Sequence, residues 1–310
     1  MSSAIRIRDL VKRYGATTAV DGISLDVEEG CLYAFLGPNG AGKSTTINCI
    51  CSLLSFDGGT IEVCGHAVGR EDDAVRHAIG VVFQESVLDP ILTVRENLAT
   101  RAALYGIRGR AFASRLAEVA ATTGIEEILD RRYGRLSGGQ RRRADIARGL
   151  VHTPRVLFLD EPTTGLDPQT RARVWASVRT LQKSSGTTVF LTTHYMEEAN
   201  HADFASIIDH GRIVASDTPA SLRVAHSHDV LRLMTRDATA LRTWLEARGT
   251  AYRERTGVFS LLVGSSLAAL PLIREAEPLL SGFELVQGSM DDVFMSLTGR
   301  DIREDKEEES

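Results

Sequence analysis

The spacing of apolar side chains predicts strands of two kinds in the first two thirds of the chain. Apolar and polar residues alternate at 5–8 and 23–27, which is the period of a strand with one buried face. The run at 156–159 is apolar without interruption, as is typical of a central parallel strand that is buried on both faces. Further short strands are predicted at 31–36, 60–65, 79–83 and 187–193.

Segments with helical spacing lie between these strands, so the pattern predicts an α/β fold. One helix follows residue 45, a charged helix ends near residue 76, and another runs to about residue 183. Between 93 and 123, apolar residues recur at helix-like intervals among charges. Because this segment lies between two strand regions, we interpret it as an inserted helical lobe that extends over about 85–150.

A second, smaller domain is predicted after the first. A hairpin at 204–215 is expected to close the first domain, which covers residues 1–220. The composition then shifts, and residues 226–300 predict a small α+β domain that ends in an amphipathic helix. Another helix of this domain is predicted at 268–280. We find no catalytic group of residues in this second domain. Residues 301–310 are acidic, and we expect them to be disordered.

Composition limits what these domains are expected to do. The 310 residues carry a net charge of −5, which argues against a surface dedicated to nucleic acid. No apolar run is long enough to span a bilayer, and no charged-then-apolar leader opens the chain. We therefore expect a cytoplasmic protein, whose work on a membrane would need a separate subunit. The four cysteines lack the spacing of a zinc site, and we expect buried thiols in a reducing compartment.

The stretch after the strand at 31–36 has the chemistry of a phosphate-binding loop. Its glycines let backbone N–H groups converge on a phosphate, and the following helix adds the positive end of its dipole. Lys43 is expected to reach the β- and γ-phosphates of a nucleoside triphosphate, and Ser44 to offer its hydroxyl to Mg²⁺. A chance glycine-rich turn would not explain the strand and helix on either side. The phosphate loop comprises Gly37, Pro38, Asn39, Gly40, Ala41, Gly42, Lys43, Ser44 and Thr45.

Two adjacent carboxylates follow the buried strand at 156–159. Active sites of open α/β sheets lie at the carboxyl ends of the parallel strands, which is where this pair is placed. Asp160 is expected to hold Mg²⁺, directly or through water, and Glu161 to act as general base toward the attacking water. A pair of surface acids that begins a loop is the alternative, but it leaves the preceding apolar run unexplained.

Three further side chains are candidates by position, and each has an ordinary alternative. A carboxamide at the end of a strand can coordinate Mg²⁺ or orient water, but Gln84 is otherwise a loop residue. His194 would meet the γ-phosphate if the ends of the parallel strands are adjacent, and is otherwise a loop or core histidine. Tyr14 offers a flat face for an adenine base, and is otherwise a strand-end aromatic.

A serine and two glycines at 137–139 open another predicted helix. The serine can cap the helix, and the glycines let a phosphate approach its N-terminus. The alternative is a capped helix that binds nothing. Arginines between 131 and 143 are compatible with nucleic acid, but charges at a helix end are more often a solvated face, and we interpret them in that way.

In this order the motifs resemble those of the ATP-binding subunits of ABC transporters, over about residues 5–217. The phosphate loop matches the Walker A motif, and 156–160 followed by Glu161 matches Walker B. The A-, Q-, D- and H-loops match Tyr14, Gln84, Asp167 and His194. The signature sequence of the family is present without substitution as Leu136, Ser137, Gly138, Gly139 and Gln140.

The resemblance implies a P-loop NTPase fold of the ABC type. This fold has a mixed sheet core, an antiparallel β subdomain and an inserted helical lobe, here followed by the small α+β domain. ATP and Mg²⁺ are the implied cofactors. The residues implied in hydrolysis are Lys43, Gln84, Glu161 and His194. Those implied to hold the metal are Ser44, Gln84 and Asp160.

The resemblance also implies partners. The signature sequence would complete the ATP site of a second copy, in a head-to-tail homodimer with two ATP molecules at the interface. The helical lobe would pass motion to an integral membrane permease on a separate chain, at the inner face of the cell membrane. No nucleic-acid partner is implied.

Two softer stretches narrow the resemblance to one subgroup. Residues 289–300 and 98–106 are similar to drug-export ATPases of the daunorubicin-resistance type, which implies export of a hydrophobic or drug-like substrate. The alternative is a soluble ABC ATPase that acts on a nucleic acid, a ribosome or a protein scaffold. A single ATPase cassette and the lack of sustained heptads argue against that alternative.

Overall fold

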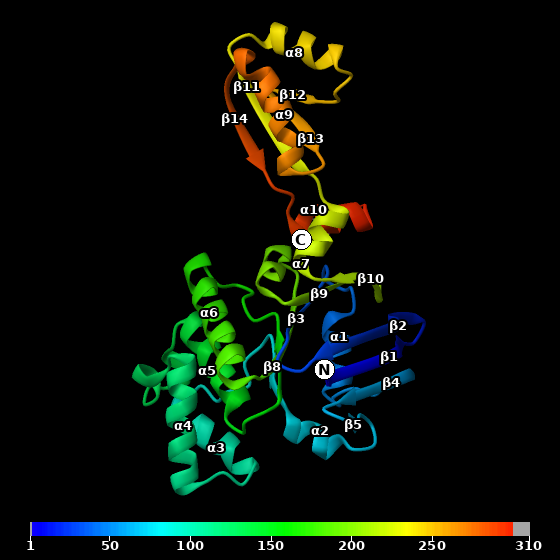
Figure 1. Cartoon of the computed structure of the whole chain (residues 1–310). Coiled ribbons are helices and arrows are strands. Elements are labelled where there is room, and N and C mark those ends of the chain that lie inside the picture. Colours follow the sequence, from blue (N-terminus) through cyan, green and yellow to red (C-terminus); the bar gives the residue numbers. More distant parts are fainter. Residues whose placement is uncertain (1, 300–310) are drawn as a thin grey trace. The chain divides into compact units, whose positions relative to one another are not determined.

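The computed structural model describes residues 2–299, and the chain divides into two units between Thr218 and Pro219. Figure 1 labels the elements of both units. The tail at 301–310, predicted to be disordered, lies outside the described residues. No helix within residues 2–299 combines the length and the apolar character needed to cross a bilayer.

The first unit is built on a mixed sheet, as predicted, and this sheet has six strands. Five neighbouring strands run parallel, and β10 pairs antiparallel with β9 at one edge. Every residue of β7 is buried, which explains its uninterrupted apolar run. In sheet order the strands are β10 (Arg212–Asp217), β9 (Phe204–Asp209), β3 (Leu32–Leu36), β8 (Thr188–Thr193), β7 (Val156–Asp160) and β6 (Ile79–Val82).

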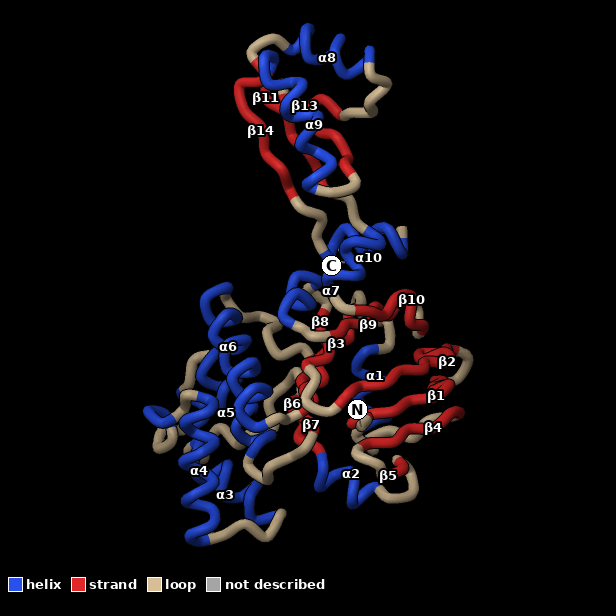
Figure 2. The backbone as a smooth tube through the Cα atoms, in the orientation of Figure 1, coloured by secondary structure: helices blue, strands red, loops and turns tan. Residues whose placement is uncertain are grey.

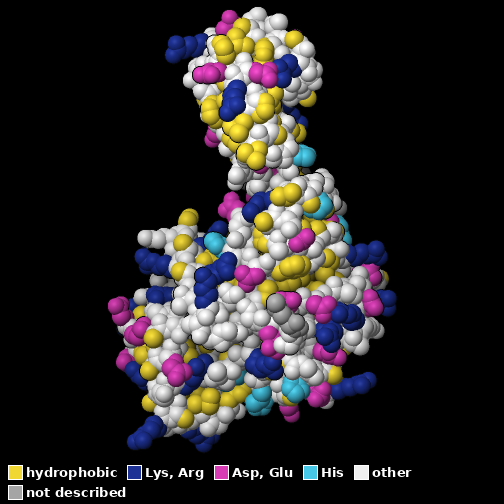
Figure 3. Space-filling view, in the orientation of Figure 1, with side chains coloured by type: hydrophobic (Ala, Val, Ile, Leu, Met, Phe, Trp, Pro, Cys, Tyr) yellow, Lys and Arg dark blue, Asp and Glu magenta, His cyan; other side chains and the backbone are white. Residues whose placement is uncertain are grey.

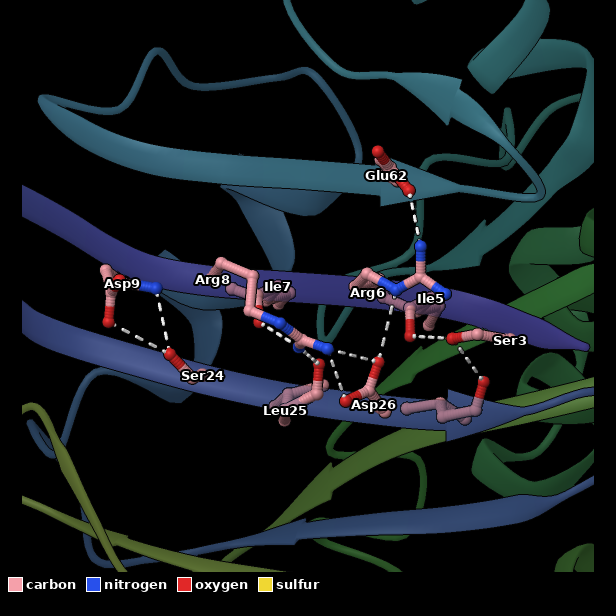
Figure 4. Close-up of polar contacts among 11 residues, drawn as sticks. Ser3, Ile5, Arg6, Ile7, Arg8, Asp9, Ser24, Leu25, Asp26 and Glu62 are labelled. Carbon is pink, nitrogen blue, oxygen red and sulfur yellow. Dashed lines mark hydrogen bonds and ion pairs between the residues drawn. The ribbon is translucent and has the colours of Figure 1, made fainter.

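A second sheet of the first unit is antiparallel. On its exposed face, charged side chains bridge the strands: Arg6 lies 3.2 Å from Glu62 and 3.5 Å from Asp26 (Figure 4). Exposed pairs of this kind contribute little stability, so the buried alternate residues set the register. The strand order is β2 (Thr17–Glu28), β1 (Ser3–Tyr14), β4 (Gly58–Val63) and β5 (His66–Ala67).

The two sheets share one hydrophobic core, which includes the helix α1 (Lys43–Ile50). The core joins Ile7 of β1, Ile47 of α1 and Phe158 of β7, all fully buried. Figure 2 shows α1 between the two sets of strands, and α1 contacts strands of both sheets. Because α1 begins at Lys43, this packing anchors the end of the phosphate loop.

Helices cover the other face of the six-stranded sheet. Leu157 alternates with the core residue Phe158 and lies against Gly149 of α5 on that face. The helical lobe is formed by α3 (Val94–Leu104), α4 (Gly109–Thr123) and α5 (Gly138–Leu150), with short 3₁₀ turns at Glu126–Ile128 and Tyr133–Arg135. The remaining helices of the first unit are α2 (Asp72–Ala78), α6 (Pro168–Ser185) and a 3₁₀ helix at Met196–His201.

The second unit contains a four-stranded antiparallel sheet with two helices packed on one face. Its strand–helix–strand repeat produces the order β12-β13-β11-β14, a split βαβ arrangement. The elements in chain order are α7 (Pro219–His226), β11 (Asp229–Thr235), α8 (Ala238–Ala247), β12 (Arg253–Arg255), β13 (Val258–Val263), α9 (Ser266–Ala276), a 3₁₀ turn at Glu277–Leu279, β14 (Leu280–Val286) and α10 (Met290–Thr298).

Two details of the second unit differ from the sequence-based expectation. The helix α7 was not predicted, because it is short and buries little beyond Pro219 and Leu222. The helix expected at 268–280 ends at Ala276. Pro278 explains this early end, because it has no N–H to continue the α-helical hydrogen bonds, and Glu277–Leu279 forms a 3₁₀ turn instead.

An aromatic stack joins the helical lobe to the sheet. The ring of Tyr105 stacks on His152 at 3.9 Å, and His152 Nε2 lies 2.8 Å from the Ile79 carbonyl oxygen at the start of β6. Burial lowers the pKa of His152 to about 4, and the charge of Arg101 adds to this effect, while the bond to Ile79 opposes it. The folded protein therefore holds His152 neutral.

This lowered pKa makes stability depend on pH in a defined window. The unfolded chain protonates His152 near pH 6.5, and the folded chain near pH 4. The stabilising effect is therefore complete above about pH 6.5 and is lost as the pH falls toward 4. Between pH 7 and pH 4.5 the free energy of unfolding should therefore decrease. We expect this decrease to be roughly 1–3 kcal/mol smaller in His152→Gln than in the parent, measured by denaturant titration at the two pH values. The exposed His210→Asn is the control and should behave as the parent.

Candidate active site

The carboxyl ends of four parallel strands bring the candidate residues to one edge of the sheet. The phosphate loop follows β3, Gln84 follows β6, Asp160 ends β7 and His194 follows β8. The Gly37 amide donates to the Thr193 carbonyl at 3.3 Å, so the start of the phosphate loop is attached to the end of β8. The parallel topology thus produces the adjacency that the sequence suggested.

The phosphate loop has glycine where no other residue fits. Gly42 has a φ of 106°, and a Cβ there would lie 2.4 Å from the Ala19 carbonyl oxygen of β2. A Cβ on Gly37 would lie 2.4 Å from the Ile208 carbonyl oxygen of β9. Both obstacles are backbone atoms, so neighbouring side chains cannot relieve them.

Lys43 is the first residue of α1 and is only 5% exposed. Its ammonium donates to the carbonyl oxygens of Gly37 and Pro38, each at 2.9 Å, and lies 3.4 Å from Glu161 Oε1. Burial lowers the pKa of Lys43, and the charge of Glu161 opposes that effect. The ammonium therefore contacts the phosphate loop and the Glu161 carboxylate at the same time.

The Glu161 carboxylate is buried between two basic groups. Besides Lys43, it accepts from Thr164 Oγ1 at 3.0 Å and lies 3.2 Å from His194 Nδ1. The contact with His194 lacks the angle of a normal hydrogen bond, so we describe it as electrostatic. Burial raises the pKa of Glu161, but the contact with His194 and the charge of Lys43 outweigh it and hold the pKa at about 2. Glu161 is therefore ionised at neutral pH.

The backbone at Glu161 lies in the left-handed region, with a φ of 45°. Few residues other than glycine adopt this region, and such strain persists only where the surroundings enforce it. The Glu161 amide donates to both the carbonyl oxygen and Oγ1 of Thr192, at 3.2 and 3.1 Å. This backbone conformation directs the Glu161 side chain away from strand β7 and toward Lys43 and His194.

Asp160 and Ser44 meet at the same edge. Ser44 Oγ donates to Asp160 Oδ1 at 3.3 Å, and Thr192 Oγ1 donates to the same oxygen at 2.5 Å. A hydroxyl and a carboxylate are hard oxygen donors of the kind that Mg²⁺ accepts. Within residues 2–299 no group of three His, Cys, Asp or Glu side chains could hold a metal on its own.

Among residues 2–299, neither the Gln84 nor the Tyr14 side chain makes a hydrogen bond or ion pair with these residues. Gln84 is exposed beyond the end of β6, and none of the hydrogen bonds among residues 2–299 involves its side chain. Tyr14 ends β1 with 50% of its surface exposed, and its ring lies 5.5 Å from Lys12 Nζ. The roles suggested for both therefore stay predictions.

The signature sequence forms the start of α5. Ser137 Oγ accepts from the Gln140 amide at 3.4 Å, and Gln140 Oε1 accepts from the Ser137 amide at 3.1 Å, which is a capping box. A Cβ on Gly139 would lie 2.3 Å from Thr170 Cγ2. The structure thus supplies an additional reason for this glycine, namely its close approach to the start of α6.

Asp167 caps the N-terminus of α6. Its Oδ1 accepts from the Thr170 amide at 2.9 Å, and hydrogen bonding to Thr170 lowers its pKa. This cap is a sufficient structural reason for an aspartate here. Asp167 and Gly139 thus both lie against Thr170, so the D-loop and the signature sequence are neighbours within one chain.

Sequence reasoning missed several buried polar residues near the site. Thr163 Oγ1 donates to Glu198, a buried carboxylate that also lies 3.9 Å from Arg171. The arginines after the signature sequence were predicted to form a solvated face, and this is wrong for Arg142, which is 7% exposed. Helical periodicity could have predicted this burial, because position 142 lies on the same face of α5 as the apolar Ile146.

The comparisons with known proteins agree with this site. A family model described as ABC transporter matches residues 20–164. The chain is 42% identical to the daunorubicin/doxorubicin resistance ATP-binding protein DrrA of Streptomyces peucetius, over 99% of this chain and 96% of that protein. It is 37% identical to the Nod factor export ATP-binding protein I of Burkholderia orbicola, over 97% of this chain and 98% of that protein.

Solved structures with the same fold are also ATP-binding cassettes. CbiO1 from Clostridium perfringens, part of an ABC transporter complex, matches with a TM-score of 0.68 and 29% identity, over 72% of this chain and 91% of that chain. A cassette in a dimeric post-hydrolysis state with ADP and Pi matches with a TM-score of 0.62 and 27% identity, over 69% of this chain and 98% of that chain.

These similarities cover nearly the whole chain and define its class. The chain belongs to the ATP-binding subunits of the ABC transporter family, and it binds nucleotide and is an ATPase. The narrower resemblance to ATPases of the daunorubicin-resistance type is confirmed by relatives of that name at 39–42% identity.

The close approach at Gly42 can be tested by substitution. Gly42→Ala should lower the free energy of unfolding by about 2–4 kcal/mol and abolish binding of a fluorescent ATP analogue, because its Cβ meets a backbone oxygen. Gly40→Ala is the matched comparison, since Gly40 also has a positive φ but open space around it. It should lose only about 1–2 kcal/mol in the same denaturant titration. Equal losses would contradict the close approach.

Proposed function

We propose that this chain powers export of a hydrophobic, drug-like substrate through a separate permease in the cell membrane. The observation that carries the proposal is the full-length similarity to proteins named for daunorubicin resistance and Nod factor export, which includes the second unit as well as the ATPase unit. In this proposal residues 1–220 hydrolyse ATP and 226–300 form an accessory domain.

The proposed catalytic roles follow from the contacts at the sheet edge. The phosphate loop binds the triphosphate, and Lys43 moves its contact from Glu161 to the β- and γ-phosphates. Because the charge of Lys43 is one cause of the low pKa of Glu161, this move makes Glu161 a stronger base toward water. His194, on the other side of Glu161, keeps the carboxylate oriented and faces the γ-phosphate. Tyr14 stacks on the adenine.

Mg²⁺ is part of the proposal. Ser44 and Asp160 fit it, because their oxygen atoms already meet at 3.3 Å beside the phosphate loop, and Gln84 would supply a third oxygen. Bound Mg²⁺ usually takes one or two carboxylates, with phosphates and water as its other ligands, so a cluster of protein carboxylates is not required. When bound, the ion would neutralise charge on the β- and γ-phosphates.

We further propose a head-to-tail homodimer that assembles two complete sites. The signature sequence of each copy would face the γ-phosphate of the other copy, with the capped N-terminus of α5 pointing at it. Asp167 lies beside the signature sequence, so it would lie at the same interface. The similarity to dimeric cassettes supports this assembly.

The proposed location is the inner face of the cell membrane, reached through the permease, which the helical lobe would contact. We propose no nucleic-acid partner. In support, Lys and Arg side chains are interspersed with Asp and Glu on the face drawn in Figure 3, and the chain as a whole is acidic.

The base assignment is tested by Glu161→Gln, which keeps the shape of the side chain but cannot accept a proton. We expect hydrolysis to fall by about 10²–10⁴, while ATP still binds with similar affinity. Phosphate release and equilibrium binding of a fluorescent ATP analogue measure the two properties. Glu127→Gln, on an exposed turn, is the control. Hydrolysis by Glu161→Gln at the parent rate would show that another group is the base.

The transport assignment is tested by co-purification. The tagged chain should bring down an integral membrane protein in near-equal amount from gently solubilised native membranes, identified by mass spectrometry. The untagged chain controls for non-specific capture. Recovery of ribosomes, DNA or a cytosolic scaffold as sole companion of an active ATPase would instead support the soluble alternative.

A further inference from the structure

The helix that carries the signature sequence also places a buried arginine against the carboxyl ends of β6 and β7. Arg142 lies on α5, two residues after the signature sequence, and is 7% exposed. Its guanidinium donates three hydrogen bonds to backbone carbonyls: Nε to Pro162 at 2.7 Å, Nη1 to Phe83 at 2.6 Å and Nη2 to Asp160 at 2.8 Å. One side chain thus joins α5 to the ends of both β6 and β7.

The three carbonyls flank two residues with proposed roles in hydrolysis. Asp160 and Pro162 lie on either side of Glu161, whose backbone is held at a φ of 45°. Phe83 directly precedes Gln84. Arg142 therefore fixes the peptides around the strained residue, and strain of this kind persists only when the surroundings enforce it.

A second residue of α5, Asp145, binds the segment that follows Gln84 in the chain. Asp145 Oδ1 accepts from Ser86 Oγ at 2.6 Å, and Oδ2 accepts from the Tyr133 hydroxyl at 3.1 Å. Asp145 also provides a negative charge near the buried Arg142 guanidinium. The segment on both sides of Gln84 is thus attached to α5 through side chains of opposite charge.

The chemistry of this contact requires arginine. A planar guanidinium presents several N–H donors in a fixed fork, so it can serve three separate carbonyls at once. A lysine ammonium is a compact point charge that reaches fewer of them. Burying a guanidinium is costly unless its donors are satisfied, so a structural role alone would be met more cheaply by an apolar side chain.

We propose that Arg142 is a positioning residue for ATP hydrolysis, which holds the peptides around Glu161 and before Gln84 in the geometry of the reaction. The inference rests on the roles assigned to Glu161 and Gln84 in the proposed function. It also gives α5 two roles, because its N-terminus serves the ATP of the second copy while Arg142 serves the site of its own chain. A displacement of the signature sequence is thereby transmitted to the catalytic carboxylate.

The test compares Arg142→Lys and Arg142→Gln in the full-length chain by steady-state ATP hydrolysis and by binding of a fluorescent ATP analogue. The phosphate loop is untouched, so both variants should bind nucleotide within about threefold of the parent. We expect kcat to fall by about 10- to 100-fold in Arg142→Gln and by a smaller factor in Arg142→Lys, since small misplacements of catalytic groups reduce rates in this range. A role in folding alone would not lower kcat while leaving binding unchanged.

Arg115→Gln is the matched control. Arg115 of α4 also donates to two backbone carbonyls, those of Leu150 and Val151, but at the far end of α5. Arg115→Gln should keep the parent kcat.

Two outcomes would overturn the inference: a comparable fall of kcat in Arg115→Gln, or the parent kcat in Arg142→Lys. If Arg142→Gln does not fold, Arg142→Lys alone decides. Glu161→Gln is measured in parallel. If Glu161→Gln is inactive and Arg142→Lys is fully active, only the positioning role of Arg142 is refuted. If Glu161→Gln is fully active, the assignment of Glu161 as the base is refuted.

Discussion

A buried carboxylate held between two basic side chains is the constraint around which the ATPase unit is built. Glu161 is 8% exposed, and an isolated carboxylate in such a place would take up a proton. Lys43 and His194 keep it ionised instead, from the ends of two other strands. This arrangement requires β3, β7 and β8 to run parallel and side by side, because only then do their carboxyl ends meet.

Much of the surrounding structure supports that arrangement. The packing of α1 in the core fixes the position of Lys43, and Thr192 holds both Asp160 and the Glu161 amide. Arg142 of α5 donates to the carbonyls of Asp160 and Pro162, the residues on either side of Glu161. The backbone around Glu161 is therefore held by contacts from the sheet and from the helical lobe alike.

The second unit is organised by a different principle. Its sheet is antiparallel and has two helices on one face, a compact arrangement that forms its own hydrophobic core around Leu233 and Phe259. Neighbouring strands of this sheet run in opposite directions, so their carboxyl ends do not meet at one edge as those of the parallel strands do. Its presence in relatives of equal length indicates that it belongs to this group of ATPases.

The sequence by itself determined the motifs and most of the elements, though not α7, because apolar periodicity and glycine positions are local properties. It predicted the phosphate loop, the buried β7 and the acids that follow it. Tertiary structure alone decided which polar groups meet: the contact of Glu161 with both Lys43 and His194 depends on strand order, which no local pattern encodes. The same holds for Arg142, whose position in a run of arginines suggested solvent. Its burial follows from the packing of α5 on strands about 20 and 60 residues away, and such long-range contacts are set by the fold as a whole.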